Sequence, residues 1–465
     1  MTTCLTLLLA LLPGDAPAPT PQRVTGNAFV IIAPQAFHAV LQDFVKHKQQ
    51  ERPTALVALE EVLRQGQGVD DPEKLKRFLF QKWRKERLGF VLLVGDVDLL
   101  PVRYMVLDRV TPAAFDYAFY PSDLYYADLA RADGSFDDWN AQKDGFHAGY
   151  FGEVRGEKNK KEPINFDGVD YLPEVAVGRW PVSTVAQTQL MVEKSLRYER
   201  ALKDGTKAGA RHAAFLHIDG WVDARGWMDG LVRKLPEGWH REKRFFGQTP
   251  PPTEVDLVRL LNAGQGLVFH AGHGDAHCWE KCFYLPSLAK LQNADRLPVI
   301  FSAGCSTAFF APLPPYQGYV DVHGKEHQGT DRGEVFTAPP PPPAPYQKGK
   351  YNRGNGLGEA LLRSGPSGAV AYIGCNTGSQ PCGLTLMEGF VHALAAAPEP
   401  RLGTCWTEAL RYYHTKQRLA QLQPDNGWYP PSIYFQGMKF MLFGDPTLPL
   451  PAPAAPSQDA RKQGG

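Results

Sequence analysis

The stretch GLVFHAGHGDAHCWEKCFYLPSLAKLQNADRLPVIFSAGCSTAFF, residues 266–310, decides the fold. It contains two short apolar runs, Leu267–Phe269 and Val299–Phe301, each with the length and composition of a buried parallel strand. Small residues follow each run and lead to a chemically active side chain, His273 after the first and Cys305 after the second. Because ligands bind outside the carboxyl ends of parallel strands, the pattern predicts an imidazole and a thiol on one rim of a sheet.

Glycines beside these two groups favour a catalytic interpretation. Gly272 and Gly274 flank His273, and another glycine precedes Cys305, so the backbone can turn sharply and a substrate can approach closely. A cysteine nucleophile with a histidine base uses this layout. Backbone N–H groups at such turns are good oxyanion donors. The alternative is a turn histidine and a buried core thiol, which is what most single His and Cys residues are.

Several other segments, in the same order along the chain, resemble the conserved blocks of the gingipain-like cysteine peptidases, relatives of caspases and legumains. Besides GHG and PVIFSAGCSTAFF, these segments are FVLLVGDVDLLPVR (90–103), SDLYYADL (122–129), PEVAVGRWPVST (173–184), GNGLGEALLRSGPSGAVAYIG (354–374) and LFGDPTLPL (442–450). The resemblance covers about residues 26–450. It implies a caspase-like fold and a cysteine-type endopeptidase.

The resemblance also implies roles for particular residues. Cys305 would attack the peptide carbonyl as a thiolate, and His273 would act as base and then protonate the leaving amine. The backbone N–H groups of Gly274 and Cys305 would hold the oxyanion. Glu174 would orient the histidine from a strand expected to be adjacent, with a structural salt bridge as the alternative. Gingipains cut after Arg or Lys, but residues 180–189, where an arginine-selective pocket is expected, contain no acidic residue.

The remaining sequence predicts an α/β fold of two caspase-like parallel-sheet halves with helices on both faces. An N-terminal half without the dyad spans residues 26–205, a catalytic half spans 206–450, and 451–465 form a disordered tail. Strands are predicted at 28–33, 90–96, 174–178, 213–218 and 368–374. Helices are predicted at 35–50, from 71 onwards, from 184 to about 202, at 253–263, 357–363, 383–396 and 404–422.

Length, composition and charge narrow the class of protein and its partners. The chain has 465 residues, a 43% apolar share and a formal net charge of +1, enough for one large or two ordinary domains and without the basic excess of a nucleic-acid-binding surface. Residues 1–20 resemble a secretory signal peptide, although no Lys or Arg precedes their apolar run. We therefore expect a secreted or periplasmic protein, with a cytoplasmic location as the alternative. No segment is long enough to span a bilayer.

Two clusters have the composition of metal sites. His270, His273, His277, Cys278 and Cys282 fall within thirteen residues, a density that suggests zinc, but their spacing matches no common finger. Asp138, Asn140, Asp144 and Glu153 place hard oxygen ligands at intervals typical of calcium, in a loop two residues longer than an EF-hand loop. A structural calcium and a plain polar loop both stay open for the second cluster.

The sequence thus predicts a cysteine endopeptidase that acts on peptides or proteins and needs no cofactor for its chemistry. The alternatives are a catalytically silent caspase-fold binding or scaffold protein and a zinc-dependent hydrolase. Seven cysteines leave one bridge open, Cys278 to Cys282 or Cys375 to Cys382. The oligomeric state and the natural substrate are not predicted.

Overall fold

The computed structural model describes residues 26–106, 118–140, 149–152, 168–207, 209–248, 252–329, 341–348, 356–423 and 429–451. The predicted signal segment and residues 452–465 of the predicted tail lie outside these ranges.

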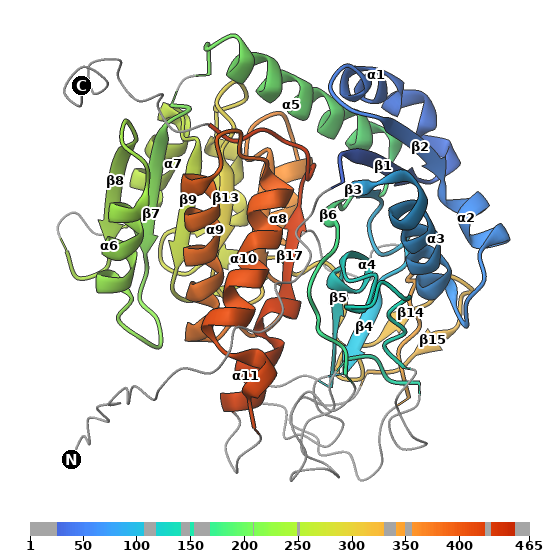
Figure 1. Ribbon diagram of the computed structural model, residues 1–465. Coiled ribbons are helices and arrows are strands. Elements are labelled where there is room, and N and C mark those ends of the chain that lie inside the picture. Colours follow the sequence, from blue (N-terminus) through green and yellow to red (C-terminus); the bar gives the residue numbers. More distant parts are fainter. Residues whose placement is uncertain are drawn as a thin grey trace, which may run out of the picture.

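A single ten-stranded sheet runs through the centre of the molecule (Figure 1), in the order β2-β1-β3-β6-β17-β16-β13-β9-β7-β8. The first half contributes β1 (Ala28–Ala33), β2 (Thr54–Ala58), β3 (Leu88–Val94) and β6 (Ala176–Trp180). The second half contributes β7 (His212–His217), β8 (His240–Phe245), β9 (Leu267–Ala271), β13 (Val299–Ser302), β16 (Ala371–Cys375) and β17 (Phe440–Phe443). The predicted α/β fold with a large, mostly parallel sheet is confirmed.

The sheet consists of two sets of strands that run in opposite directions. Strands β2, β1, β3, β6 and β17 are parallel to one another, as are β16, β13, β9, β7 and β8. The reversal falls between β16 and β17, which pair antiparallel. The carboxyl ends of β9 and β13 therefore lie at the same edge of the sheet as the amino ends of β1, β3 and β6.

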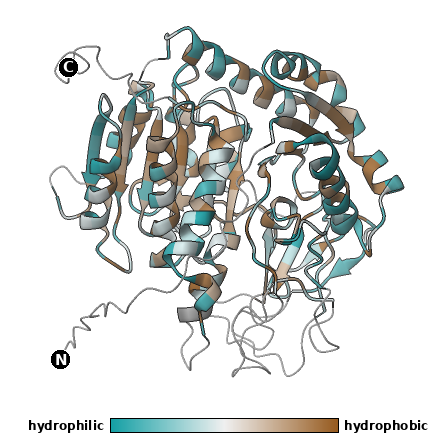
Figure 2. Ribbon diagram, in the orientation of Figure 1, coloured by the Kyte–Doolittle hydropathy of each residue, from teal (hydrophilic) through white to brown (hydrophobic). Residues whose placement is uncertain are grey.

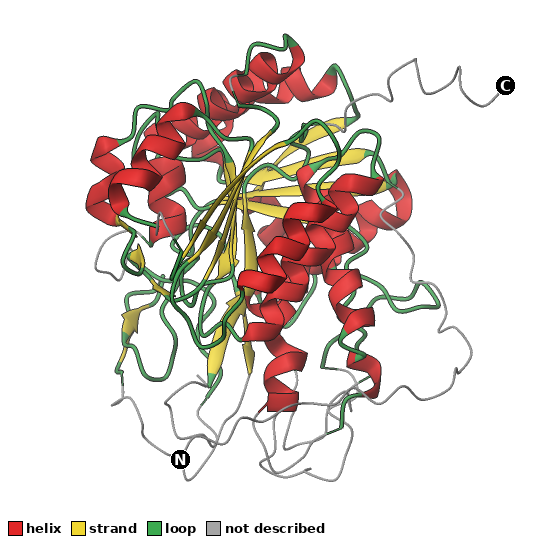
Figure 3. Ribbon diagram, turned by 90° about the vertical axis from the view of Figure 1, so that its left-hand side faces the viewer, coloured by secondary structure: helices red, strands yellow, loops and turns green. Residues whose placement is uncertain are grey.

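Helices cover both faces of the sheet, as the edge-on view of Figure 3 shows. One face packs against α1 (His38–Gln49), α5 (Val185–Lys203), α7 (Glu254–Ala263) and α8 (Leu357–Arg363). The other packs against α2 (Leu59–Gln65), α3 (Asp71–Glu86), α4 (Leu124–Ala127), α6 (Arg225–Lys234), α9 (Leu384–Ala396) and α10 (Leu402–Lys416). Each face has one hydrophobic cluster that includes residues of both halves, so the halves share their cores.

Smaller elements complete the described structure. They are β4 (Arg103–Val106) with β5 (Phe119–Ser122), the hairpin strands β10 (Gly274–Asp275), β11 (Cys278–Trp279) and β12 (Phe283–Tyr284), the pair β14 (Tyr319–Val320) and β15 (Glu326–His327), and helix α11 (Tyr429–Gln436).

Local sequence explains where the main helices begin. The side chain of Thr184 accepts a hydrogen bond from the Gln187 N–H and caps α5, and Thr253 caps α7 through the Asp256 N–H, because a threonine oxygen satisfies an N–H group that has no partner in the first turn. The sheet strands are mostly apolar and the exposed helix faces polar (Figure 2), which matches a sheet covered on both faces.

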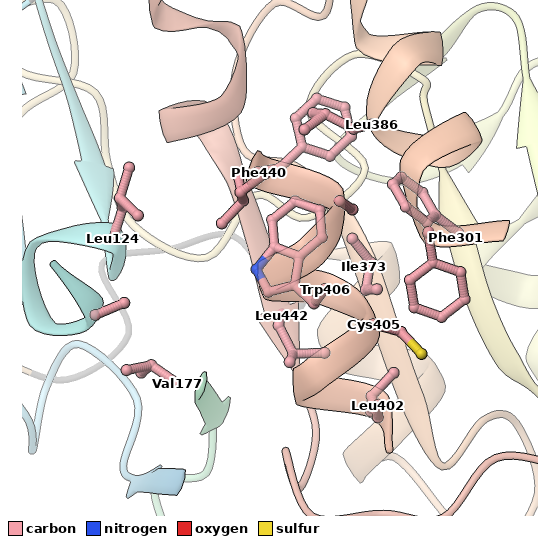
Figure 4. Close-up of a cluster of buried hydrophobic side chains, with 14 of the residues drawn as sticks. Leu124, Val177, Phe301, Ile373, Leu386, Leu402, Cys405, Trp406, Phe440 and Leu442 are labelled. Atoms are coloured by element: carbon pink, nitrogen blue, oxygen red, sulfur yellow. The ribbon is translucent and has the colours of Figure 1, made fainter. Parts of the chain in front are cut away.

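An apolar contact joins the two halves beside β17. Figure 4 shows Leu124 and Val177 of the first half facing Trp406 and Leu442 of the second. The Trp406 ring also packs against Phe301 of β13, with ring centroids 6.0 Å apart. The strand that leads to Cys305 is thus packed into the core that both halves share.

Candidate active site

His273 and Cys305 lie at the same rim because β9 and β13 are neighbours. The two strands pair in parallel, with His270 opposite Ser302, and the Ala303 N–H extends this ladder by donating to the His270 carbonyl at 2.8 Å. His273 and Cys305 both line one pocket beyond the strand ends. The structure therefore brings together the two side chains that the sequence singled out.

The loop after β13 presents the thiol of Cys305. Ser306 has a left-handed backbone with φ of 54°, and its N–H donates to the Thr377 carbonyl at 2.7 Å, which ties this loop to the loop after β16. The Ser379 N–H donates to the Cys305 Sγ at 3.3 Å. Burial raises the pKa of the Cys305 thiol, and the hydrogen bond from Ser379 acts in the opposite direction. A buried thiol of this kind needs a base to become a nucleophile.

A tight hairpin follows His273 and sets the backbone of Gly274 against that of Cys305. A Cβ atom on Gly274 would lie 2.6 Å from the Thr307 Cγ2 and 3.4 Å from the Cys305 carbonyl oxygen, so only glycine fits there. The Glu280 N–H donates to the His273 carbonyl at 3.2 Å, and Gly274 pairs with Trp279. Since hydrogen-bonded and non-bonded pairs alternate in an antiparallel ladder, the Gly274 N–H points away from β11.

His270 belongs to the core beneath this rim. It is fully buried, its Nδ1 lies 2.8 Å from the Ser302 Oγ, and its ring stacks on Trp279 at 4.7 Å. Burial lowers the pKa of His270 to about 3, so the imidazole is neutral. Its side chain is directed into the packing of the sheet.

The zinc cluster suggested by the sequence does not assemble in the described part of the chain. Within it, no group of three or more His, Cys, Asp or Glu side chains is placed to hold a metal ion. His277 is exposed at the tip of the hairpin, while Cys278 and Cys282 are buried. The cysteines in the described ranges are free thiols, so neither of the two bridges left open by the sequence is formed.

Sequence reasoning missed Asp219, which follows β7 and approaches His273. Its carbonyl accepts the His273 N–H at 2.9 Å, and its carboxylate pairs with Lys281 at 2.6 Å. The Lys281 ammonium and, to a smaller extent, His273 lower the pKa of the Asp219 carboxyl. The signal that could have found it is an acidic residue directly after the strand AAFLHI, but that strand's position beside β9 is not visible in the sequence.

The expectation that the strand of Glu174 is adjacent to the strands that lead to His273 and Cys305 is wrong. Its strand, β6, is separated from β13 by β17 and β16. The Glu174 carboxylate accepts hydrogen bonds from the N–H groups of Leu129, at 2.7 Å, and Ala130, at 3.1 Å. Burial raises the pKa of Glu174 to about 7. This side chain therefore holds a loop of the first half.

The calcium prediction falls partly outside the described residues. Asp144 and Glu153 lie outside the ranges that the structure describes. Of the other two candidates, Asp138 accepts the Asn140 N–H at 3.0 Å and Asn140 accepts the Gly149 N–H at 3.3 Å. The first of these contacts closes a local turn, and a calcium ion in this loop stays a prediction.

A caspase-like sheet with a histidine and a cysteine at the ends of adjacent strands is the arrangement of the caspase-related cysteine peptidases. The model of Peptidase family C25 matches residues 23–451. The chain belongs to this family, and this membership supports a cysteine peptidase of the gingipain type.

Solved structures agree on the fold. The crystal structure of the Arg-specific cysteine proteinase gingipain R is similar at a TM-score of 0.60 and 18% identity, over 93% of this chain and 80% of that one. The complex of the pro- and mature domains of Porphyromonas gingivalis RgpB gives 0.58 and 18%, over 91% and 79%. At these identities the likeness shows the fold alone.

A curated relative is an uncharacterized protein of Archaeoglobus fulgidus, 22% identical over 232 residues. The match spans 49% of this chain and 49% of that relative, so about half the length of each. In the ranges that the structure describes, no helix is both long and apolar enough to cross a membrane.

Proposed function

We propose that the protein is a cysteine endopeptidase in which Cys305 is the nucleophile and His273 the general base and acid. The observation that carries the proposal is that both side chains line one pocket at the carboxyl ends of the neighbouring strands β9 and β13. A thiol and an imidazole on one rim, next to glycine backbone, is the constellation that nucleophilic acyl transfer requires.

The reaction proceeds in two halves. His273 takes the proton of the Cys305 thiol as the sulfur attacks the peptide carbonyl, and then gives that proton to the leaving amine. The carbon–nitrogen bond breaks and a thioacyl bond to Cys305 remains. Water, with His273 again acting as base, then attacks the thioester, and the acid product leaves while the thiol regains its proton.

The backbone N–H groups of Gly274 and Cys305 stabilise the oxyanion that forms in both halves. Two observations support this role for Gly274. Its N–H points away from β11 by the alternation of the hairpin ladder, and its Cα lies against the backbone of Cys305. Donors fixed before the reaction need no rearrangement as charge develops.

Asp219 replaces Glu174 in the proposal as the acidic residue next to His273. Its carboxylate interacts electrostatically with the His273 imidazole, and its carbonyl fixes the His273 backbone. A carboxylate near the imidazolium stabilises the charge that forms when the histidine takes a proton.

Secretion or a periplasmic location, and peptides or proteins as substrates, complete the proposal. They rest on the sequence of residues 1–20 and on the family. A catalytically silent scaffold is the competing function, and it is weakened by the presence of both dyad members with their glycines.

Replacement of the nucleophile tests the proposal. Cys305→Ala should abolish both peptide cleavage and labelling by a thiol-directed peptide probe, because the methyl group cannot form the thioacyl bond. Cys405→Ala is the matched control, since Cys405 is a buried thiol on α10 outside the pocket. Undiminished labelling or cleavage in Cys305→Ala would overturn the assignment.

A further inference from the structure

The pocket beside Cys305 has apolar walls. The apolar lining residues include Trp221, Val222 and Ala224 from the segment after β7, and Pro381 and Leu384 from the segment around the start of α9. The pocket volume is about 50 Å³, and because one water molecule needs about 10–15 Å³ of such a cavity, only a few waters fit in it. A short side chain fits this space, and a long one does not enter it fully.

A second histidine, His217, lines this pocket besides His273, and its ring is neutral. The Nε2 of His217 accepts the Ala224 N–H at 3.3 Å, and its Nδ1 lies 3.2 Å from the Ala271 carbonyl. Accepting at one nitrogen and donating at the other requires the neutral ring. Burial also lowers the pKa of His217, in agreement with the neutral form.

Two aspartates, Asp219 and Asp223, are next to pocket-lining residues in the sequence, and both are paired with basic side chains. Asp223 makes two hydrogen bonds to the Arg225 guanidinium, at 2.8 and 2.6 Å, and Asp219 pairs with Lys281 at 2.6 Å. Neither aspartate lines the pocket, and the described residues that line it include no Asp or Glu. A cationic side chain bound there would lose its hydration and would meet no carboxylate on the pocket wall.

We propose that this pocket receives the side chain on the amino side of the cleaved bond, the P1 residue, and that it selects small uncharged residues such as alanine and valine. The inference rests on the proposed function, because the P1 side chain lies next to the carbonyl that Cys305 attacks. It differs from the arginine specificity in the name of gingipain R. The fold is shared, and the chemistry of the pocket wall sets the specificity.

A series of fluorogenic peptides tests the specificity directly. The peptides share one sequence at the other positions and carry alanine, valine, leucine, phenylalanine, lysine, arginine or aspartate at P1. We expect kcat/KM for the alanine and valine peptides to exceed that for the arginine and lysine peptides by about a hundredfold, the range that pocket contacts supply. Arginine or lysine peptides cleaved as fast as the alanine peptide would overturn the inference.

A charge placed on the pocket wall gives a second test. Val222 lies on the wall and is 44% exposed, so Val222→Asp should fold and should raise the ratio of arginine to alanine cleavage about tenfold or more by supplying a counter-charge. Val255→Asp, at a 77% exposed site on α7, should leave the ratio unchanged. An unchanged ratio in Val222→Asp would contradict the assignment of this wall to P1.

Labelling of Cys305 distinguishes a failure of the proposed P1 specificity from a failure of the proposed function. A protein that is alkylated at Cys305 by a peptidyl electrophile and prefers arginine peptides would overturn the specificity and keep the proposed function. A protein that cleaves no peptide and is not labelled at Cys305 would overturn the function, and the specificity with it.

Discussion

His273 lies between two other histidines in the sequence, and the structure gives the three rings different surroundings. His270 is buried against Trp279, His277 is exposed at the hairpin tip, and only His273 lines the pocket with Cys305. The backbone of β9 and its hairpin therefore separates three identical side chains into a core residue, a surface residue and a residue that lines the pocket with Cys305.

His273→Ala should reduce kcat by about a hundredfold or more, because a positioned general acid-base contributes at least that much. The matched control, His277→Ala, removes an imidazole from the same hairpin and should change kcat far less. Steady-state kinetics on one peptide, with circular dichroism to confirm folding, measures both. Equal losses of kcat in the two folded variants would show that the assignment of His273 as the base is wrong.

At this scale the sequence predicts much of the site. Glycine beside a reactive side chain at the end of an apolar run is a local signal, so the sequence singles out His273, Gly274 and Cys305, and the structure places His273 and Cys305 in one pocket. Asp219 was not found, because its proximity to His273 arises from the pairing of β7 with β9, which joins residues about fifty positions apart. Glu174 was misplaced for the same reason, since strand order is not a local property.

Among the elements, the β10–β11 hairpin packs tightly at the site. It directs the Gly274 N–H outward, and a Cβ atom on Gly274 would meet Thr307. Its geometry therefore fixes the position of the proposed oxyanion donor.

Gly274→Ala should lower kcat by about a hundredfold, the effect of losing one oxyanion donor, because the added methyl would meet the Thr307 Cγ2 at 2.6 Å and the hairpin must shift. Gly230→Ala adds the same methyl on α6, where the nearest atom lies 3.9 Å away, and should leave kcat unchanged. A Gly274→Ala enzyme with normal turnover would place the oxyanion donor elsewhere.

Prediction of the elements succeeded where periodicity was strong. The predicted strands at 28–33 and 213–218 correspond to β1 and β7 to within one residue, because buried parallel strands are continuous apolar runs. The edge strand β8 was missed, since its sequence HREKRF is charged, as suits an exposed edge. The reversed direction of β17 also has no local signal, because it is fixed by pairing with β16.

At the scale of the whole molecule, folding buries the acidic side chain of Glu174, which does not line the pocket of His273 and Cys305. Burial raises the pKa of Glu174 to about 7 from its ordinary value of 4.5. Between these pH values the folded chain holds a proton that the unfolded chain has lost, so this group's contribution to stability is complete below pH 4.5 and is lost as the pH rises towards 7.

Glu174→Gln should remove this pH dependence, because glutamine resembles the protonated acid and can still accept from Leu129 and Ala130. The variant and the wild type should have similar free energies of unfolding near pH 4, and the variant should be more stable above pH 7, by about 3 kcal/mol at most. Denaturant unfolding across this range measures the difference, with exposed Glu237→Gln as the control. A difference independent of pH would contradict the account, and a large loss of kcat would restore Glu174 to the catalytic site.

The shape of the whole sheet was only partly predictable. Two α/β halves follow from the alternation of strands and helices, but their union in one sheet depends on β17, which lies between β16 and β6. Contacts such as that of Trp406 with Phe301 join segments about a hundred residues apart. Sequence pattern predicts which residues are buried, and the partner of each comes from the fold.

The most direct test of the central claim is to map the site of covalent labelling by a peptidyl electrophile with an alanine P1 residue. We predict one adduct per chain, on Cys305, and a loss of peptide cleavage in proportion to labelling. In His273→Ala the adduct should form more slowly than in the wild type. An adduct on another cysteine, or full cleavage after Cys305 is modified, would contradict the account.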